Sequence, residues 1–443
     1  MMKEEKERLD ELFDRLYPLT RSITGPGLRE SLDILKEVIP LDVEHVSSGT
    51  EIFDWTIPEE WRVYDAYLVG PNGKKYADID ETNLHVINYS KPVDKRLSLE
   101  ELKHHIYTDP ESPDAIPYVT SYYDRKWGFC LSKNTFDSLP EGEYHAYIDS
   151  KFIDGKLSYG HCKLEGKSDD EVLISSYICH PSLANNELSG PLVLCALYNR
   201  IKRWSNRHFT YRFVLAPETI GSLAYLHNYS DELTEHLVSG AVLTCLGGYK
   251  KRVNYQKSRM GDSLLDRVVL NEKKFGDIEL EVRQFTPING SDERQFCSPG
   301  FNLPVGQFAK TVYGEYDGYH NSKDDKEFMT IEALIDSADH IETILKRLKY
   351  ALCYKNTKPY GEPFLSKYNL YSSVNAPDTR NDSTDYIQND KRVFLNKALR
   401  VLNYCDGERE MVDIAEKYGY SIKDLDSIID TLVEKKLLKK IGI

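Results

Sequence analysis

The sequence predicts an α/β protein, an α/β/α sandwich around a mixed, largely parallel sheet. From about residue 143, short apolar runs typical of buried strands alternate with segments whose apolar residues recur at helical spacing. Strands that alternate with helices in this way indicate a parallel sheet covered by helices on both faces. Apolar residues make up 40% of the chain, and its 31 tyrosines favour ordered, strand-rich structure over disorder.

Two helices are expected at the start of the chain, within residues 4–40. Apolar positions recur at helical spacing in KEEKERLDELFDRLYPLT and in GLRESLDILKEVI, and Gly25-Pro26-Gly27 separates the two segments. The first segment is charged and lacks the apolar core of a signal peptide, and no run of about 18 apolar residues occurs in the chain. We therefore expect a cytoplasmic protein without a membrane partner.

Residues 46–135 differ in character from the segments on either side and predict an inserted, β-rich domain. FDWTIPEEWRVYDAYLVGPNGKKYADI is typical of two strands around a PNGK turn, and SLEELKHHIY at 98–107 predicts one short helix. Prolines crowd the loop that follows, at positions 110, 113 and 117.

The main domain is expected to comprise residues 1–45 and 136–360. Its first two strands alternate in polarity, and Asp154-Gly155 between them predicts a hairpin turn. The strands are expected at 143–152, 156–166, 172–179, 211–217, 241–248 and 303–309, and the helices at 190–204, 219–229 and 330–354.

The end of the chain predicts a linker at 361–385 and a winged-helix-like domain at 386–443. The linker is polar and poor in pattern, whereas the domain shows three short helices and a turn. From Lys391 to Ile443 there are eleven Lys or Arg and nine Asp or Glu, and the candidate recognition helix carries aspartates that would face phosphates unfavourably. We expect this domain to bind a protein partner, to associate with itself or to pack within the chain.

Charge and cysteine usage argue against two further classes of protein. The formal net charge of −14 argues against nucleic-acid binding by the chain as a whole. None of the eight cysteines forms a CxxC pair, so we expect reduced, buried thiols and no structural zinc ribbon.

Polar side chains follow the predicted parallel strands at the points where the strands end. In an open parallel sheet, ligands bind beyond these carboxyl ends. His180 and Glu218 directly follow two of the expected strands, and other polar residues near strand ends are Cys245, Asp292 and His320. We therefore expect a site at this edge of the sheet.

The residue types at this edge are those of a hydrolytic zinc site. Such a site needs neutral imidazoles and a carboxylate as ligands, and a nearby carboxylate as general base. His180, Glu187 and His320 supply the ligand set, and Glu218 supplies the base. The alternative for His180 is a strand-end histidine bonded to loop carbonyls, and the alternative for Glu187 is a carboxylate favoured near a helix N-terminus.

The order of several motifs adds a resemblance. HPSLANNELSGP, APETIGS, the TCLGG strand, SDERQF and GYHNSKDD together resemble a bacterial aminopeptidase-like family often associated with polysaccharide-biosynthesis genes. The resemblance extends over most of the chain, including the insert and the helical tail. It implies the zinc-exopeptidase fold that co-catalytic zinc aminopeptidases and zinc carboxypeptidases share.

The resemblance also implies roles for single residues. His180 and His320 resemble the first and last metal-binding histidines, and Glu218 resembles the general base. Three ligand positions of di-zinc aminopeptidases differ here, because the sequence has Asn186, Thr219 and Cys245 where a bridging aspartate, a second glutamate and an aspartate are expected. We therefore expect one zinc ion at most.

Four residues are candidates for contacting the substrate or supporting the ligands: Asn186, Cys245, Asp292 and Arg294. For Cys245, a buried inert thiol is the alternative. Asp292 could instead cap a helix, and Arg294 could be a solvated ion-pair residue.

The sequence thus predicts a zinc-dependent amide-bond hydrolase, aminopeptidase- or carboxypeptidase-like, acting on a peptide or another small amide. One alternative is a non-catalytic binding or regulatory protein with a degenerate metal site and a winged-helix interaction module. Another is a transcription regulator with a sensor domain, which the acidic charge balance disfavours.

Overall fold

The computed structural model describes residues 2–370 and 390–442, and the chain divides into two compact units. The first unit comprises residues up to Gly261 together with Arg283–Glu342, and the second comprises Asp262–Val282 and the residues from Thr343 onward. The domain boundaries predicted from the sequence are not decided by this division and stay predictions.

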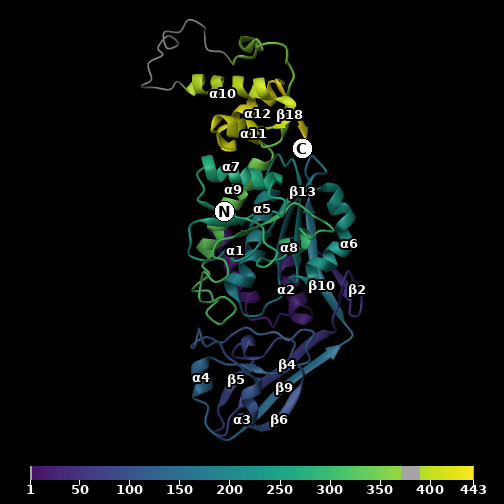
Figure 1. Ribbon diagram of the computed structural model, residues 1–443, viewed down its shortest axis with the longest axis vertical. Helices are drawn as coiled ribbons and strands as arrows, with labels where there is room; N and C mark the ends of the chain where they lie inside the picture. Colours follow the sequence, from purple (N-terminus) through teal and green to yellow (C-terminus); the bar gives the residue numbers. More distant parts are fainter. Residues whose placement is uncertain (1, 371–389, 443) are drawn as a thin grey trace. The chain divides into compact units, whose positions relative to one another are not determined.

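A mixed sheet forms the centre of the first unit (Figure 1). The central pairs are parallel, and the pairs toward both edges are antiparallel. In spatial order, its strands within this unit are β1 (Asp42–Ser47), β10 (Lys156–Leu164), β12 (Thr210–Ala216), β11 (Glu171–Tyr177), β13 (Leu237–Leu243), β16 (Val305–Ala309) and β14 (Val253–Gln256).

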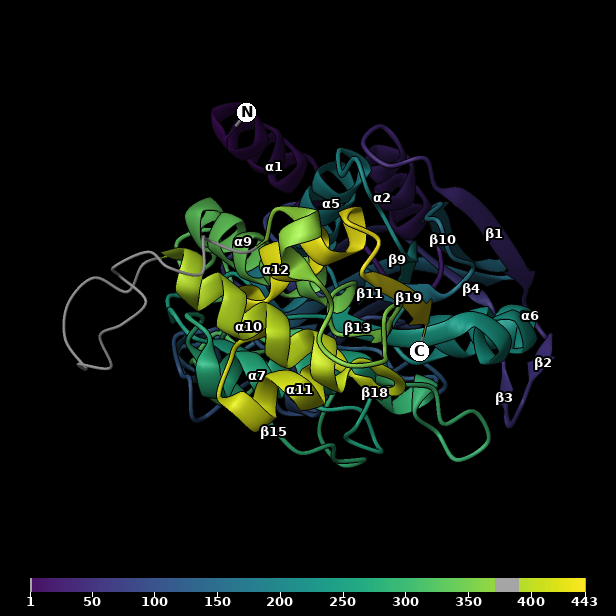
Figure 2. The same cartoon turned by 90° about the horizontal axis from the view of Figure 1, so that it is seen from above.

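Helices cover both faces of this sheet, which explains the continuous apolar runs. Every residue of β11 and β12 is buried, as in strands that have no face toward water. Helix α5 (Ser189–Lys202) lies on one face and α6 (Ile220–His236) on the other (Figure 1). The helices α1 (Met2–Leu16) and α2 (Pro26–Lys36) gather on the same side as α5 (Figure 2).

Gly190 allows α5 to pack closely against the sheet. A methyl group on Gly190 would overlap Ser176 Oγ and the carbonyl oxygen of Leu243. Both atoms belong to central strands, so neither can move without disturbing the packed sheet.

Gly190→Ala is therefore expected to lower the free energy of unfolding by about 1–3 kcal/mol, as overpacking of a core does. Urea denaturation of the purified protein measures the change. Gly300→Ala is the matched control, because a methyl group there meets nothing within 4 Å. Equal stability of the two variants would contradict the close approach.

The segment predicted as an insert forms, together with β9, a second β-rich layer with its own core. Its four-stranded antiparallel sheet has the order β5-β4-β9-β6, with β5 (Lys75–Asp78), β4 (Glu60–Val69), β9 (Glu143–Ile153) and β6 (Val93–Ser98). Its core includes Leu68, Trp127, Phe129, Tyr144 and Ile148. The short elements are β2 (Glu51–Ile52), β3 (Trp55–Thr56), β7 (Ile106–Tyr107), β8 (Phe129–Cys130), α3 (Leu99–Leu102) and α4 (Lys133–Asp137).

The predicted PNGK turn is confirmed, but the predicted hairpin at Asp154-Gly155 was wrong, and the short helix predicted before residue 107 is present in shorter form. Strands β9 and β10 follow one another around Asp154-Gly155 without pairing, because β9 joins the insert's sheet and β10 joins the central sheet. The helix predicted at 98–107 is only one turn of α3 followed by a short 3-10 helix at Lys103–His105.

The second unit contains the predicted three helices of the tail: α10 (Asp390–Tyr404), α11 (Met411–Tyr418) and α12 (Asp426–Glu434). They accompany an antiparallel sheet in the order β18-β17-β19, with β18 (Asp406–Glu410), β17 (Cys353–Asn356) and β19 (Leu438–Gly442). The unit also holds α7 (Leu264–Phe275) and most of β15 (Leu280–Arg283). Residues 371–385 of the predicted linker lie outside the described residues.

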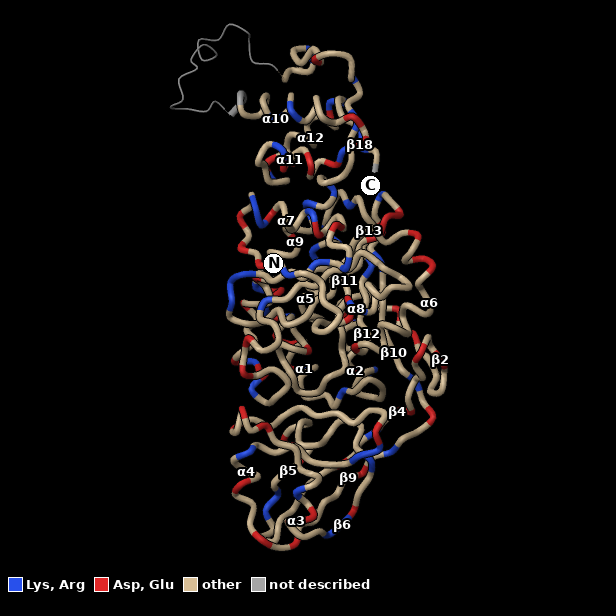
Figure 3. Tube along the Cα trace, in the orientation of Figure 1, with Lys and Arg blue, Asp and Glu red and all other residues tan. Residues whose placement is uncertain are grey.

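The helix predicted at 330–354 is shorter than expected. It ends at Leu348 as α9 (Ile331–Leu348), and the following residues form β17. The predicted pairing of Ser421 with Asp424 is present as a capping box. The charges differ between these helices: α10 carries Lys397 and Arg400, whereas the charged residues of α12 are Asp426, Asp430 and Glu434 (Figure 3). Within the described parts of the chain, every helix is too short or too polar to cross a membrane.

Candidate metal and catalytic site

Three of the predicted site residues line one pocket at the carboxyl edge of the parallel strands. His180 follows β11, Glu218 follows β12, and His320 lies in the loop after β16. The pocket has a volume of about 320 Å³. It is named here the site pocket, and its lining also includes Cys179 and Thr219. The structure therefore places these three side chains in one pocket, as expected from their positions after strand ends.

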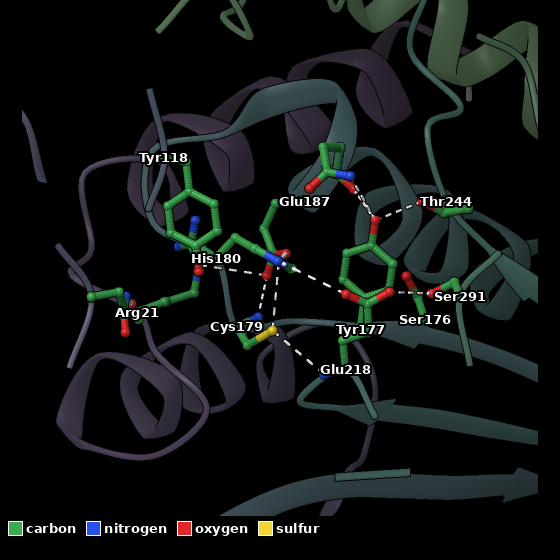
Figure 4. A network of polar contacts seen from close by, with 12 residues as sticks. Arg21, Tyr118, Ser176, Tyr177, Cys179, His180, Glu187, Glu218, Thr244 and Ser291 are labelled. Carbon is green, nitrogen blue, oxygen red and sulfur yellow. Dashed lines mark hydrogen bonds and ion pairs between the residues drawn. The ribbon is translucent and has the colours of Figure 1, made fainter. Parts of the chain in front are cut away.

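His180 occupies the centre of a polar network, between two carboxylates (Figure 4). Its Nδ1 lies 2.6 Å from Glu187 Oε2, and its Nε2 lies 3.9 Å from Glu218 Oε2. Burial opposes a charge on the ring, but Cys179 and Glu187 raise the pKa of His180 well above its usual value. The two ring nitrogens therefore face different surroundings, and only Nε2 faces Glu218 across open space.

Glu187 is fully buried and lies on the Nδ1 side of His180, outside the lining of the site pocket. The Cys179 amide donates a hydrogen bond to Glu187 Oε1, and Arg21 Nε lies 3.9 Å from the same oxygen. Arg21 is itself fully buried and donates from Nε to the carbonyl oxygen of His180 at 2.9 Å. Both oxygens of Glu187 are thus engaged by the protein, and the carboxylate holds His180 in orientation.

Two spaces beside His180 differ in whether they leave room for a zinc ion. Among the described residues, one group offers three possible ligand atoms within 4.8 Å of one another: Cys179, His180 and Glu187. A gap of 2.6 Å between His180 and Glu187 is too short for an ion with bonds of about 2.0–2.1 Å to each. The 3.9 Å gap between His180 Nε2 and Glu218 does accommodate such bonds.

His320 reaches the same pocket from the other side. Its ring centre lies 5.6 Å from that of His180, and the Tyr118 amide donates to its carbonyl oxygen at 2.7 Å. Burial, together with the neighbouring His180, lowers the pKa of His320 to about 3. Its imidazole is therefore neutral at physiological pH, the form in which histidine binds a metal.

Glu218 is held at the start of a strained turn. Its Oε1 accepts a hydrogen bond from Ser291 Oγ at 2.8 Å, which leaves Oε2 toward His180. The next residue, Thr219, has φ 62° and ψ −75°, and the Ile220 amide donates to the Glu218 carbonyl oxygen at 2.8 Å. This is a positive-φ γ-turn, which is rare and costly for a β-branched residue. Strain of this kind is typical of functional sites.

Asp292 supports this turn. Its Oδ1 accepts a hydrogen bond from the Thr219 amide at 2.7 Å. Burial, and then the charge of Glu218, raise the pKa of Asp292 to about 8. Arg294 donates to the Ser291 carbonyl oxygen at 3.1 Å and does not line the site pocket. The supporting contact expected here is thus made by Asp292, whereas Arg294 is not among the residues that line the pocket.

Asn186 and Cys245 lie behind the pocket in a neutral network. Asn186 Nδ2 donates to the Tyr177 hydroxyl at 3.0 Å and lies 3.9 Å from Cys245 Sγ. The Tyr177 hydroxyl also lies 2.7 Å from Thr244 Oγ1. Burial raises the pKa of Cys245 to about 12, so the thiol stays protonated. Neutral groups thus occupy two of the positions at which the sequence departs from di-zinc aminopeptidases.

Sequence reasoning missed Arg21, Cys179 and Tyr118. Cys179 could have been considered, because it directly precedes His180 at the strand end. Arg21 lies in a loop between two helices, and no periodicity distinguishes it from an exposed arginine. The Tyr118 ring contacts both imidazoles edge-on, at 5.0 Å from His180 and 5.5 Å from His320 between ring centres. Its place in the proline-rich loop gave no signal of this contact.

Comparisons with known proteins agree with the architecture. A family model described as a domain of unknown function (DUF4910) matches residues 10–351, and a winged helix-turn-helix model matches residues 352–440. A Clostridium acetobutylicum protein, named for polysaccharide biosynthesis and an aminopeptidase-like domain, is 39% identical over 430 residues. That match covers 97% of this chain and 95% of the relative.

Two solved structures are also similar. A crystal structure from Clostridium acetobutylicum, described as a candidate peptidase, is 37% identical with a TM-score of 0.87, covering 99% of this chain and 98% of the other. A zinc aminopeptidase from Bacillus subtilis is 13% identical with a TM-score of 0.55, covering 76% of this chain and 94% of the other, and shows a shared fold. The predicted fold class, the aminopeptidase-like resemblance and the C-terminal winged helix are confirmed.

Proposed function

The chain belongs to the DUF4910 family, and from that premise we propose that it is a zinc-dependent amide-bond hydrolase of the aminopeptidase-like type. The shared fold with a zinc aminopeptidase and the name of the Clostridium relative support this proposal. The observation that carries it is the convergence of His180 Nε2, His320 and Glu218 on one pocket, with Glu218 Oε2 3.9 Å from His180 Nε2.

The imidazoles of His180 and His320 are proposed to hold one zinc ion, and His180 would have to lose its Nε2 proton to do so. Glu187 was expected from the sequence as a third ligand, but its contacts support a different role, in which it fixes the orientation of His180 from the Nδ1 side. When bound, zinc would act as a Lewis acid toward the scissile carbonyl and lower the pKa of water. Hydrolytic zinc sites commonly have three protein ligands, so we expect chelators to remove the ion readily.

Glu218 is proposed as the general base. Ser291 fixes one of its oxygens, and the other faces the pocket, where it can take the proton from the attacking water and deliver it to the leaving amine. Asp292 acts through the backbone, because its bond to the Thr219 amide holds the strained turn that presents Glu218.

The neutral network at Asn186 and Cys245 favours a second candidate, a non-catalytic binding protein with a reduced metal site. The winged helix is proposed to bind protein, because the charged residues of α12, the candidate recognition helix, are Asp426, Asp430 and Glu434, which would face phosphates unfavourably.

Turnover assays test the first candidate against the second. The purified protein is incubated with aminoacyl anilides, dipeptides and N-acylated amino sugars, before and after chelation and zinc addition. We expect hydrolysis of at least one class, its loss on chelation and its return with zinc. Absence of turnover across the panel, in protein that does bind zinc, would favour the binding protein.

A further inference from the structure

The inserted segment supplies an aromatic side to the site pocket. Trp55, Tyr118, Tyr122 and Tyr123 all line it and are named here the aromatic wall. The lining includes no Lys or Arg, and its one carboxylate is Glu218. A substrate carboxylate would therefore find no Lys or Arg partner among the described lining residues, which disfavours a carboxypeptidase-like activity.

Two members of the aromatic wall are exposed at the pocket's mouth. Trp55 is 41% exposed and Tyr123 is 51% exposed, and their ring centres lie 6.1 Å apart. The Tyr123 hydroxyl donates to the Thr56 carbonyl oxygen at 2.9 Å, which ties this loop to the β2–β3 hairpin that carries Trp55. Both rings are thus held in place while parts of their surfaces stay open to a ligand.

The deeper members of the aromatic wall add hydroxyl groups. The Tyr118 and Tyr122 hydroxyls lie 3.2 Å apart, and Thr120 lines the pocket beside them. Ring faces next to hydroxyls complement a pyranose, which has an apolar C–H face and a rim of hydroxyls. An aliphatic side chain would instead desolvate these hydroxyls without offering them a further hydrogen bond.

The size and position of the pocket limit the ligand further. A volume of about 320 Å³ lies at the small end for ligand sites, so one monosaccharide fits better than a longer chain. The Tyr118 ring lies against both imidazoles, so a group stacked on the aromatic wall would lie directly beside His180 and His320.

We propose that the substrate is an N-acylated amino sugar whose pyranose ring stacks on Trp55 and Tyr123. This inference rests on the proposed function for the reaction. Water adds its oxygen to the acyl carbon, the carbon–nitrogen bond breaks, and the nitrogen leaves with a proton as the free amine. The products are one carboxylate and one amino sugar, with no oxidant or other co-reactant.

Binding of N-acetylglucosamine, followed by ligand-observed NMR titration, tests the sugar assignment without turnover. We expect saturable binding to wild-type protein and a loss of about tenfold in affinity in Trp55→Ala, since one stacking contact is removed. Tyr64→Ala is the control, because Tyr64 is another exposed aromatic residue of the insert and lies outside the pocket lining. Its affinity should stay within twofold of wild type.

Three outcomes would overturn the sugar assignment: no binding of the sugar, equal binding by Trp55→Ala, or saturable binding of the dipeptide leucylglycine in its place. Failure of the proposed function is distinguishable. Sugar binding that depends on Trp55, without hydrolysis of the sugar amide in zinc-loaded protein, would contradict the hydrolase and leave the binding assignment standing.

Discussion

Replacing Glu187 with alanine is expected to lower the free energy of unfolding by about 3–5 kcal/mol, because Arg21 would be left buried without its countercharge. Metal affinity should also fall by about 10–100-fold, since His180 would lose the carboxylate that orients it. Urea denaturation of zinc-free protein measures the first effect, and competition with a zinc chelator measures the second.

Two variants make this result specific. Glu141→Ala changes an exposed glutamate of the insert and should alter stability by less than about 0.5 kcal/mol. The double variant Arg21→Met with Glu187→Leu removes both charges and should be more stable than Glu187→Ala. Wild-type stability of Glu187→Ala would contradict a stabilising ion pair between Arg21 and Glu187. Loss of stability without loss of zinc affinity would contradict the orienting role.

Glu218→Gln is expected to lower kcat by about 10²–10⁴-fold while the zinc content and the unfolding midpoint stay unchanged. Glutamine keeps the size of the side chain and can still accept from Ser291, but it cannot take a proton from water. Steady-state kinetics on the substrate that the turnover assays identify, with metal analysis of the same preparation, gives both quantities.

Glu141→Gln is the matched control, because it removes the same charge from an exposed glutamate. Retained activity in Glu218→Gln would contradict the role of Glu218 as general base. Loss of zinc in Glu218→Gln would show that Glu218 is a metal ligand, a role that the 3.9 Å distance to His180 Nε2 also permits geometrically.

The central sheet could be predicted because continuous apolar runs in β11 and β12 follow from burial on both faces. The pairing of β9 and β10 could not be predicted. Their alternating polar and apolar residues identify half-buried strands but do not indicate which sheet each strand joins. The overlong helix at 330–354 has a similar cause. Helical spacing continues past Leu348, but pairing of β17 with two strands distant in sequence prevails.

The site could be predicted where a residue's position depends on a strand end. His180 and Glu218 follow neighbouring parallel strands, so the topology alone brings them together. The side of His180 on which Glu187 lies depends on the local path of seven residues, which no pattern fixes. Arg21 and Tyr118 come from distant loops, and their contacts with the site depend on tertiary packing.

The zinc content of the purified protein tests the central claim most directly. We expect about one zinc per chain after gentle purification, its loss in His180→Ala and in His320→Ala, and its retention in His104→Ala, which alters an exposed histidine of the insert. Less than about 0.2 equivalents in the wild-type protein, or a content unchanged in both site variants, would contradict a zinc centre in this pocket.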